Sequence, residues 1–383
     1  MFNTSQIEIS RSALEHNLKF IRNFIGQKVL YSSVVKGNAY GHGIEIFVPL
    51  AMQCGVNHFS VFSADEALRV HKVTDSACTI MIMGALDNDQ MEWAIKNNIE
   101  FFVFELDRLQ NAITISQKMG TKANIHIEVE TGMNRTGFCV KAMPEIMKLL
   151  KKEREHLNLR GLCTHYAGAE SIANFYRIKN QQKTYAKALK KMASDGLSPQ
   201  LRHTSCSAAT LRYPKTQLDM VRIGILQYGF FPSKEVLIDY MIRNNEHDYP
   251  LRRLISWKTT VMDVKSVKTG EFVGYGTSYL ANTDMKIATI PVGYSHGFSR
   301  GMSNQGRVLI HGQRVSVVGT VNMNMMSVDI THVENVQKGD EVVLIGNQGD
   351  LEISVASFSD FSDQINYELL TRLPSDIPRK VFV

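Results

Sequence analysis

The chain has 383 residues, of which 44% are hydrophobic and 21% charged, and its formal net charge is +6 at pH 7. This length and composition predict a folded protein with one large and one smaller domain, and they exclude a disordered chain. The basic residues come in short clusters without interleaved aromatic residues, which argues against a nucleic-acid-binding protein. No window is apolar over the roughly 18 residues that a membrane span needs, and the N-terminus does not resemble a signal peptide. We therefore expect a cytoplasmic protein that does not bind membranes.

The five cysteines are scattered along the chain and never form a CxxC pair. This spacing argues against a zinc site and against a disulfide framework, and it fits a reducing compartment. We expect no bound metal.

The first 244 residues alternate between short apolar runs and helical patterns. Ile7-Glu8-Ile9 predicts a short strand, and Ser12 is expected to cap a helix that ends at Gly26. Eight further apolar runs predict strands at 29–35, 58–62, 79–83, 100–104, 124–130, 160–165, 201–206 and 220–226. Helical patterns lie between them at 91–97, 106–118, 142–151 and 172–194.

Eight such units in roughly 200–250 residues are typical of a (β/α)8 barrel of the TIM type. A doubly wound open sheet is the alternative, but it usually has fewer strands and a GxGxxG motif after the first one, which is missing here.

The pattern changes near 244–250, where helical periodicity largely ends. Short β-rich runs follow at 254–264, 285–291, 308–310, 315–318, 326–330 and 341–345, and a last helical stretch covers about 361–372. We expect a barrel domain over residues 1–244 and a mainly β domain over 245–383, built as a small barrel or a sandwich. Residues 1–10 could form a strand that joins the β domain.

The apolar run 29–35 ends on Lys36, which is followed by a loop with three glycines, Gly37-Asn38-Ala39-Tyr40-Gly41-His42-Gly43. Burial disfavours the charged form of a lysine, so a lysine at the end of a buried strand suggests Schiff-base chemistry with a carbonyl group. A strand-end lysine that reaches out to water is an equally good interpretation of this position alone.

In a (β/α)8 barrel, functional residues gather at the carboxyl ends of the strands, and phosphate groups bind after strands seven and eight. The predicted strand ends carry Arg135, His165, Ser207 and Arg222, and Gly224-Ile225 offers backbone N–H groups after the eighth strand. Each feature is weak alone, since an arginine there is more often a salt-bridge partner. Together, a lysine and a phosphate site suggest pyridoxal phosphate as the cofactor.

These residues lie in motifs that resemble those of the alanine racemase family, whose members have a barrel and a β-rich C-terminal domain. Val35 to Gly43 resembles the pyridoxal-phosphate signature of that family. Six further stretches match in the same order: 131–135, 164–166, 220–224, 274–276, 290–294 and 365–368.

The resemblance implies that Lys36 binds the cofactor as a Schiff base and acts as one of two catalytic bases. Tyr275 from the partner subunit would be the second base, on the opposite face, so that a homodimer with shared active sites is expected. Because tyrosine is a poor base at its usual pKa, cationic neighbours should assist it, and His165 and Arg222 are the expected ones. Arg222 would also hydrogen-bond the pyridine nitrogen and leave it unprotonated.

The resemblance implies further binding residues for the cofactor and for a small amino-acid substrate. Arg135 would bind the phenolic oxygen of the cofactor and the substrate carboxylate, with help from the backbone of Met323. Tyr294 would narrow the site to a small side chain. The cofactor-binding set is Lys36, Tyr40, Arg135, His165, Ser207, Arg222, Gly224, Ile225 and Tyr367, of which Ser207, Gly224, Ile225, Tyr40 and Tyr367 would hold the phosphate.

Two departures from the family pattern bear on function. Glu128 stands where many members carry a carbamylated lysine, and we expect its carboxylate to accept a hydrogen bond from Arg135; a solvated residue without a role is the alternative. The substrate entrance differs at His296, Thr320, Asn322 and Asn324. Strict alanine specificity is therefore open, and a racemase acting on serine or larger amino acids is the alternative.

Three rival functions fit the sequence less well. A pyridoxal-phosphate decarboxylase shares the architecture, but its C-terminal cysteine-aspartate motif and its glycine-rich phosphate loop are missing. A non-catalytic carrier of the cofactor would lack residues 245–383, and an inactive homologue would not need both Lys36 and Tyr275. The resemblance suggests production of D-alanine for peptidoglycan, although a catabolic role stays open.

Overall fold

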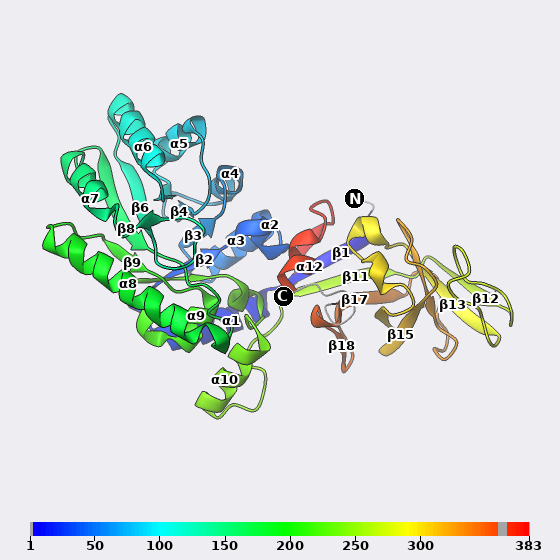
Figure 1. Ribbon diagram of the computed structural model, residues 1–383. Coiled ribbons are helices and arrows are strands. Elements are labelled where there is room, and N and C mark those ends of the chain that lie inside the picture. The colour runs from blue at the N-terminus through cyan, green and yellow to red at the C-terminus, as the bar shows by residue number, and fades with distance from the viewer. Residues whose placement is uncertain (1–2, 359–365, 383) are drawn as a thin grey trace. The chain divides into compact units, whose positions relative to one another are not determined.

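The computed structural model describes residues 3–358 and 366–382, and it divides the chain into two compact units. The barrel unit comprises Ser12–Lys36 and Val48–Arg253. The β unit comprises Met1–Arg11, Gly37–Phe47 and Leu254–Val383. Each unit is described separately below (Figure 1).

The barrel unit contains eight parallel strands, each close to a predicted apolar run. They are β2 (Leu30–Val34), β3 (His58–Val61), β4 (Thr79–Ile82), β5 (Glu100–Val103), β6 (Ala123–Glu130), β8 (Leu157–Cys163), β9 (Leu201–His203) and β10 (Met220–Ile223). The strands pair in the order β10-β2-β3-β4-β5-β6-β8-β9, and the short β7 (Phe138–Cys139) pairs with β6. A bridge between Cys206 and Arg222 joins the two ends of this order. The predicted barrel is therefore confirmed and the open sheet is excluded.

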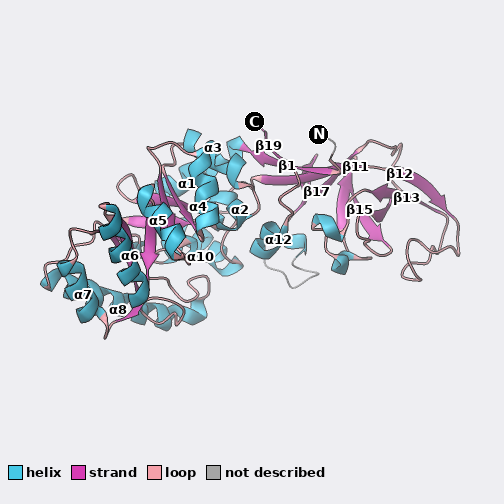
Figure 2. Ribbon diagram, turned by 90° about the horizontal axis from the view of Figure 1, so that it is seen from above, coloured by secondary structure: helices cyan, strands magenta, loops and turns pink. Residues whose placement is uncertain are grey.

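Helices lie outside the barrel strands (Figure 2). They are α1 (Arg11–Ile25), α3 (Ile44–Gln53), α4 (Ala64–Val73), α5 (Asn88–Lys96), α6 (Leu106–Met119), α7 (Met143–Lys152), α8 (Phe175–Ser194), α9 (Ser207–Arg212) and α10 (Lys234–Asn244). Apolar residues at helical spacing explain the packing: Leu14, Leu18, Ile21 and Ile25 form the buried face of α1. This helix begins at Arg11, so the predicted cap Ser12 lies inside it. None of the helices in residues 3–358 and 366–382 is long and apolar enough to cross a membrane.

Alternation along the barrel strands sends one set of side chains outward to the helices and the other set into the barrel. On β6, Ile125 and Ile127 belong to the apolar set, whereas His126 and Glu128 belong to the other. The interior of this barrel is consequently not purely apolar, and it contains buried ionisable groups.

The β unit is built around one sheet with the strand order β12-β13-β16-β15-β14-β17-β11-β1-β19, in which β18 pairs with β17. Its strands are β1 (Ser5–Ser10), β11 (Ile255–Thr260), β12 (Asp263–Val267), β13 (Met285–Ile290), β14 (Arg307–Ile310), β15 (Gln313–Val318), β16 (Met326–Asp329), β17 (Glu341–Gln348), β18 (Leu351–Ile353) and β19 (Arg379–Phe382). The N-terminal strand β1 pairs antiparallel with β11 and parallel with β19. Trp257, Phe298 and Phe358 pack together in its core.

Local sequence explains two features of the β unit. His311 and Gly312 have φ values of 51° and 71° and connect β14 to β15 by the two-residue turn that suits a hairpin. The predicted last helix is seen as α12 (Asn366–Arg372), and residues 361–365 of that prediction lie outside the described part of the chain.

Candidate active site

Lys36 directly follows β2, at the carboxyl ends of the parallel strands. The preceding Val35 donates its N–H to a carbonyl of β3 at 2.8 Å. This pairing fixes the backbone position from which the Lys36 side chain extends. The side chain is exposed at the rim of the barrel, but the surrounding protein removes part of the hydration of its ammonium group. This desolvation and the charge of Arg135 lower the pKa of Lys36, and Glu66 opposes the effect. Lys36 therefore loses its proton more readily than a free lysine does.

The loop after Lys36 belongs to the β unit and forms a left-handed turn. Four consecutive residues, 37–40, have φ between 51° and 63°. A left-handed conformation costs about 1–2 kcal/mol for each residue with a side chain, so this turn needs support. Backbone hydrogen bonds provide it, from the N–H of Gly41 to the carbonyl of Gly37 and from Gly43 to Asn38, each at 2.9 Å.

Tyr40 ends this turn, and its backbone contacts the buried His42. The Nδ1 atom of His42 lies 3.0 Å from the carbonyl oxygens of both Ala39 and Tyr40, so it must carry a proton and donate it. Burial lowers the pKa of His42 to about 4, which keeps the ring neutral. His42 thus ties the turn together without adding charge.

Arg222 extends from β10 into the barrel, where it donates from Nη2 to the carbonyl of Thr164 at 2.8 Å. His165 follows Thr164 in the chain, after the end of β8. Burial, Arg222 and Arg135 lower the pKa of His165 to about 3, so that its ring is neutral at physiological pH. The expectation that His165 is a cation is therefore wrong, because the two arginines already supply positive charge to this region.

Ser207 and Gly224 come together at the ends of β9 and β10. Ser207 begins α9, and its Oγ accepts the N–H of Gly224 at 3.0 Å. Ile225 begins a short 3-10 helix that covers Ile225–Tyr228. A hydroxyl group and backbone N–H groups therefore meet in the two loops that were predicted to share a phosphate.

Glu128 is only 5% exposed and lies on β6. Its Oε2 accepts a hydrogen bond from Thr136 at 2.8 Å. Across the residues that the structure describes, no hydrogen bond or ion pair joins Glu128 to the exposed Arg135, so the predicted direct contact is not present. Burial raises the pKa of Glu128, and the Thr136 hydroxyl, Arg222 and Arg135 oppose this rise. Its interaction with the arginines is therefore at longer range.

Glu130 shapes the loop that carries Arg135. Its carboxylate accepts the backbone N–H of Asn134 at 2.8 Å and also that of Gly132. These hydrogen bonds fix the conformation of the loop after β6, and with it the backbone position of Arg135.

Tyr275, Tyr294 and Met323 all lie in the β unit. Tyr275 is 76% exposed, between Gly274 and Gly276, which both have positive φ. The loops of Tyr294 and Met323 lie side by side, because Tyr294 donates its N–H to Asn322 at 3.0 Å. Tyr367 lies in α12, but its side chain is outside the described part of the structure.

The altered entrance residues lie in these same loops. Asn324 donates to Ser295 at 3.0 Å, and Thr320 lies 3.1 Å from Ser278. The Nδ1 atom of His296 accepts the N–H of Gly293 at 3.2 Å. None of these contacts involves a carboxylate or an arginine.

Within the barrel unit, the structure brings the predicted Lys36, Arg135, His165 and Arg222 into one electrostatic environment. The sequence interpretation missed Glu66, which acts on the pKa of Lys36, and Thr136, the partner of Glu128. It also missed His203, which Arg222 contacts. A histidine inside a predicted apolar strand was the available signal for His203.

Comparisons with known proteins identify the family of the chain. The family model described as the N-terminal domain of alanine racemase matches residues 9–232, and that of the C-terminal domain matches residues 254–381. The alanine racemase of Leptospira interrogans is 31% identical over 378 residues, which cover 99% of this chain and 96% of the relative. That of Methanococcus maripaludis is 34% identical over 373 residues and 97% of both chains.

Solved structures of alanine racemases have the same fold. The structure from Clostridium difficile superposes with a TM-score of 0.91 at 29% identity and covers 100% of this chain and 96% of that one. The structure from Bacillus anthracis with bound L-Ala-P has a TM-score of 0.89 at 31% identity, with the same coverage. The chain therefore belongs to the alanine racemase family.

Proposed function

We propose that this protein is a pyridoxal-phosphate-dependent alanine racemase that interconverts L-alanine and D-alanine. The observation that carries the proposal is the environment of Lys36, an amine of lowered pKa at the mouth of a barrel beside Arg135, His165 and Arg222. Family membership supports the same reaction.

The residues present fit pyridoxal phosphate. An amine suits its aldehyde, arginines suit its anionic oxygens, and a hydroxyl beside backbone N–H groups suits its phosphate. The residues that would hold it are Lys36, Arg135, His165 and Arg222, with Ser207, Gly224, Ile225, Tyr40 and Tyr367 around the phosphate. When bound, this cofactor withdraws electrons from the α-carbon of an amino acid and makes the α-hydrogen acidic.

Racemisation needs a proton taken from one face of the α-carbon and returned to the other face. Lys36 is our candidate for one face, because its lowered pKa means that the Nζ amine gives up its proton more readily than an ordinary lysine does. The phenol of Tyr275 of the partner subunit is our candidate for the other face. Its exposure of 76% within one chain is compatible with this role. We therefore propose a homodimer with shared active sites.

Arg222 would face the ring nitrogen of the cofactor. Because a guanidinium group stays protonated, it can donate to that nitrogen but cannot give it a proton. The cofactor would then withdraw electrons less strongly, which disfavours side reactions such as transamination. His165, which is neutral, can only hydrogen-bond Tyr275 of the partner subunit and cannot attract its phenolate by charge.

Alanine is the proposed substrate because Tyr294, with Tyr367, would narrow the site. Arg135 and the backbone of Met323 would bind the substrate carboxylate. A wider range that includes serine or lysine is the second candidate, because His296, Thr320, Asn322 and Asn324 change the charge of the entrance. We propose that the D-alanine produced is used for peptidoglycan synthesis.

The test is loss of optical purity with added pyridoxal phosphate, using L-alanine, L-serine and L-lysine in parallel. Wild type should racemise alanine fastest, Lys36→Ala should be inactive, and Tyr275→Phe should lose at least about 100-fold in kcat, as expected when a general acid–base group is removed. Equal rates on serine or lysine would favour the wider substrate range. Failure to racemise any of the three, despite cofactor bound at Lys36, would overturn the proposal.

A further inference from the structure

A line of hydrogen bonds crosses the inside of the barrel from Arg222. The Nη1 atom of Arg222 lies 2.5 Å from Nδ1 of His203. The Nε2 atom of His203 lies 2.8 Å from Nδ1 of His126, and Nε2 of His126 lies 2.7 Å from a carboxylate oxygen of Glu100. These four residues, which we call the donor chain, come from four different strands: β10, β9, β6 and β5.

The chemistry of its two ends fixes the direction of every bond in the donor chain. A guanidinium group can only donate, so Nδ1 of His203 must accept from Arg222 and its proton must sit on Nε2. That proton is donated to Nδ1 of His126, whose own proton must then sit on Nε2. A carboxylate can only accept, so Glu100 receives it. Both histidines are thus neutral and carry their proton on Nε2.

The donor chain is closed off from water. All four side chains are buried, and His126 and His203 have no exposed surface. The ring centroid of Phe102 lies 6.0 Å from that of His126 and 5.8 Å from that of His203. The guanidinium of Arg222 lies over the same phenyl ring. Burial lowers the pKa of both histidines, which agrees with neutral rings.

A glycine on the intervening strand leaves room for the central bond. A Cβ atom at Gly161 of β8 would lie 2.1 Å from Nδ1 of His126 and 2.9 Å from Nε2 of His203, the two atoms that share the hydrogen bond. Any side chain at this position would therefore push the two imidazoles apart.

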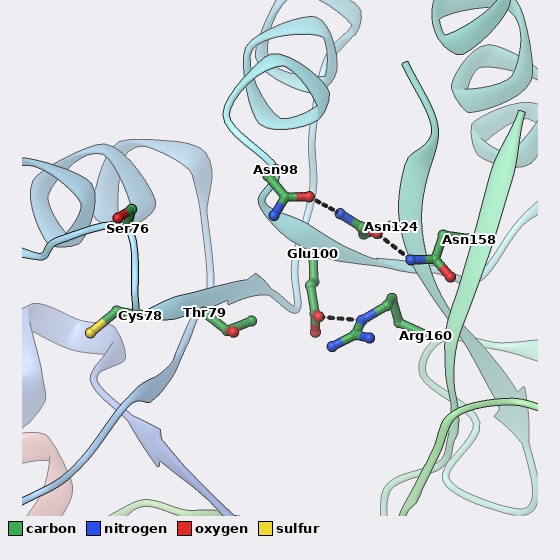
Figure 3. A pocket seen from close by; sticks show the side chains of 8 residues that line it. All are labelled: Ser76, Cys78, Thr79, Asn98, Glu100, Asn124, Asn158 and Arg160. Atoms are coloured by element: carbon green, nitrogen blue, oxygen red, sulfur yellow. Dashed lines mark hydrogen bonds and ion pairs between the residues drawn. The ribbon is translucent and has the colours of Figure 1, made fainter.

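Glu100 is held in place at the far end of the donor chain. Its second oxygen accepts from Nε of Arg160 at 2.6 Å. Both residues line a polar pocket of about 230 Å³, together with a ladder of hydrogen-bonded amides, Asn98, Asn124 and Asn158 (Figure 3). The pocket lies at the amino-terminal ends of β5, β6 and β8, opposite the end that carries Lys36. Burial alone would raise the pKa of Glu100, but the hydrogen bond from His126 and the nearby His58, whose Nε2 lies 3.7 Å away, lower it, which favours the ionised carboxylate.

Arg222 is a buried cation, and among the described residues no carboxylate lies within ion-pair distance of it. A buried charge normally needs a partner. Glu100 is the buried anion at the other end of the donor chain, so its charge reaches Arg222 through two oriented imidazole dipoles.

We propose that Glu100, acting through His126 and His203, is a positioning residue that fixes the orientation of the Arg222 guanidinium. What Arg222 then does to the cofactor rests on the proposed function. A glutamine at position 100 can still accept from His126, but it removes the negative charge that polarises the two imidazoles, so that His203 Nδ1 would accept less strongly from Arg222.

The first arm of the test does not depend on racemase activity. Nitrogen-15 NMR of the full-length wild-type chain reports which ring nitrogen of each histidine carries a proton, and loss of signals in His126→Gln and His203→Gln assigns the two rings. We expect both rings to be neutral and protonated on Nε2. A proton on Nδ1 of either ring, or a doubly protonated ring, would overturn the proposal even if the protein proves to be a racemase.

The second arm uses the cofactor-loaded enzyme and Glu100→Gln, with Glu153→Gln as the control because Glu153 is also a buried carboxylate but lies at the end of α7. We expect Glu100→Gln to bind pyridoxal phosphate about 5-fold or more weakly in equilibrium dialysis, to shift its absorbance maximum, and to lower kcat about 10-fold with little change in KM. The control should match wild type. Wild-type affinity, spectrum and kcat in a folded Glu100→Gln variant would overturn the proposal. If that variant does not fold, the NMR arm decides.

Discussion

At the scale of single residues, burial determines which groups at the barrel mouth carry charge. Desolvation lowers the pKa of both Lys36 and His165, and the two nearby arginines add to the effect. Lys36 therefore tends towards the free amine and His165 is neutral, whereas Arg222 keeps its charge. The region has one reactive amine and fixed cations, which is the combination that the proposed chemistry needs.

Glu128→Gln should lower turnover and stabilise the fold at the same time. The substitution removes a negative charge that attracts Arg222 and Arg135, and we expect kcat for alanine to fall about 10-fold, equivalent to ~1.4 kcal/mol. Burial raises the folded-state pKa of Glu128 above its unfolded value, so the ionised carboxylate destabilises the fold as pH rises through that pKa, and the penalty is absent at about pH 4 and below.

The melting temperature of Glu128→Gln should therefore exceed that of wild type at pH 8 but not at pH 4, by roughly 2–4 °C for each kcal/mol relieved. Thermal unfolding at the two pH values and steady-state kinetics measure both effects, with Glu153→Gln as the matched control. An unchanged kcat would contradict a role of Glu128 in turnover. An equal change in melting temperature at both pH values would contradict the charge argument.

Single residues at strand ends could be predicted from the sequence, and residues inside strands could not. Lys36 follows an apolar run and Arg222 is the last but one residue of β10, and the barrel fold places both towards the carboxyl ends of the strands. Glu100, His126 and His203 sit within or beside such runs, and their contact depends on the mutual register of three strands, which no local pattern gives. Glu128 shows the same limit, because its partner is Thr136 and not the predicted Arg135.

At the scale of elements, the left-handed turn at 37–40 is the unusual feature. It is stabilised by backbone hydrogen bonds and by contacts within the β unit, where Arg379 donates to the carbonyl of Gly41 at 3.1 Å. Strain held by surrounding structure is typical of functional loops. We infer that the turn fixes the backbone conformation at Tyr40.

Gly41→Ala should disrupt this turn far more than a comparable glycine substitution elsewhere in the β unit. Gly41 and Gly270 have φ of 81° and 86°, so an alanine at either site costs about 1 kcal/mol in backbone strain. Only at Gly41 would the new Cβ lie 1.9 Å from a carbonyl oxygen, that of Leu370, whereas at Gly270 nothing lies within 4 Å. Urea denaturation should show a loss of at least about 3 kcal/mol for Gly41→Ala. Equal losses in the two variants would contradict the predicted clash.

Elements with a strong hydrophobic pattern could be predicted well. All eight barrel strands fall within or close to the apolar runs, because parallel strands covered by helices are buried and rich in apolar residues. The left-handed turn could not be predicted in detail, since glycines indicate a loop but not the sign of φ at Asn38 and Ala39. The β domain was expected as a small barrel or a sandwich, and the pairing order of its sheet depends on contacts between distant segments.

At the scale of the whole molecule, the β unit is assembled from three separate segments of the chain. Strand β1 from the N-terminus pairs with both β11 and β19, so the two ends of the described chain contribute neighbouring strands at one edge of the sheet. The loop after Lys36 also belongs to this unit. The signature loop is therefore shared between the two units of the fold, with Lys36 in one and Tyr40 in the other.

The central claim is that Lys36 of one subunit works with Tyr275 of the partner subunit, and a mixed dimer tests it most directly. Lys36→Ala and Tyr275→Phe chains are co-expressed with different tags, and the heterodimer is isolated and assayed with L-alanine and pyridoxal phosphate. If the active sites are shared between subunits, one of the two sites in the heterodimer has both native residues. The heterodimer should then regain about half of wild-type activity, although both parent homodimers are nearly inactive. Activity no higher than the mean of the two parents would contradict the account.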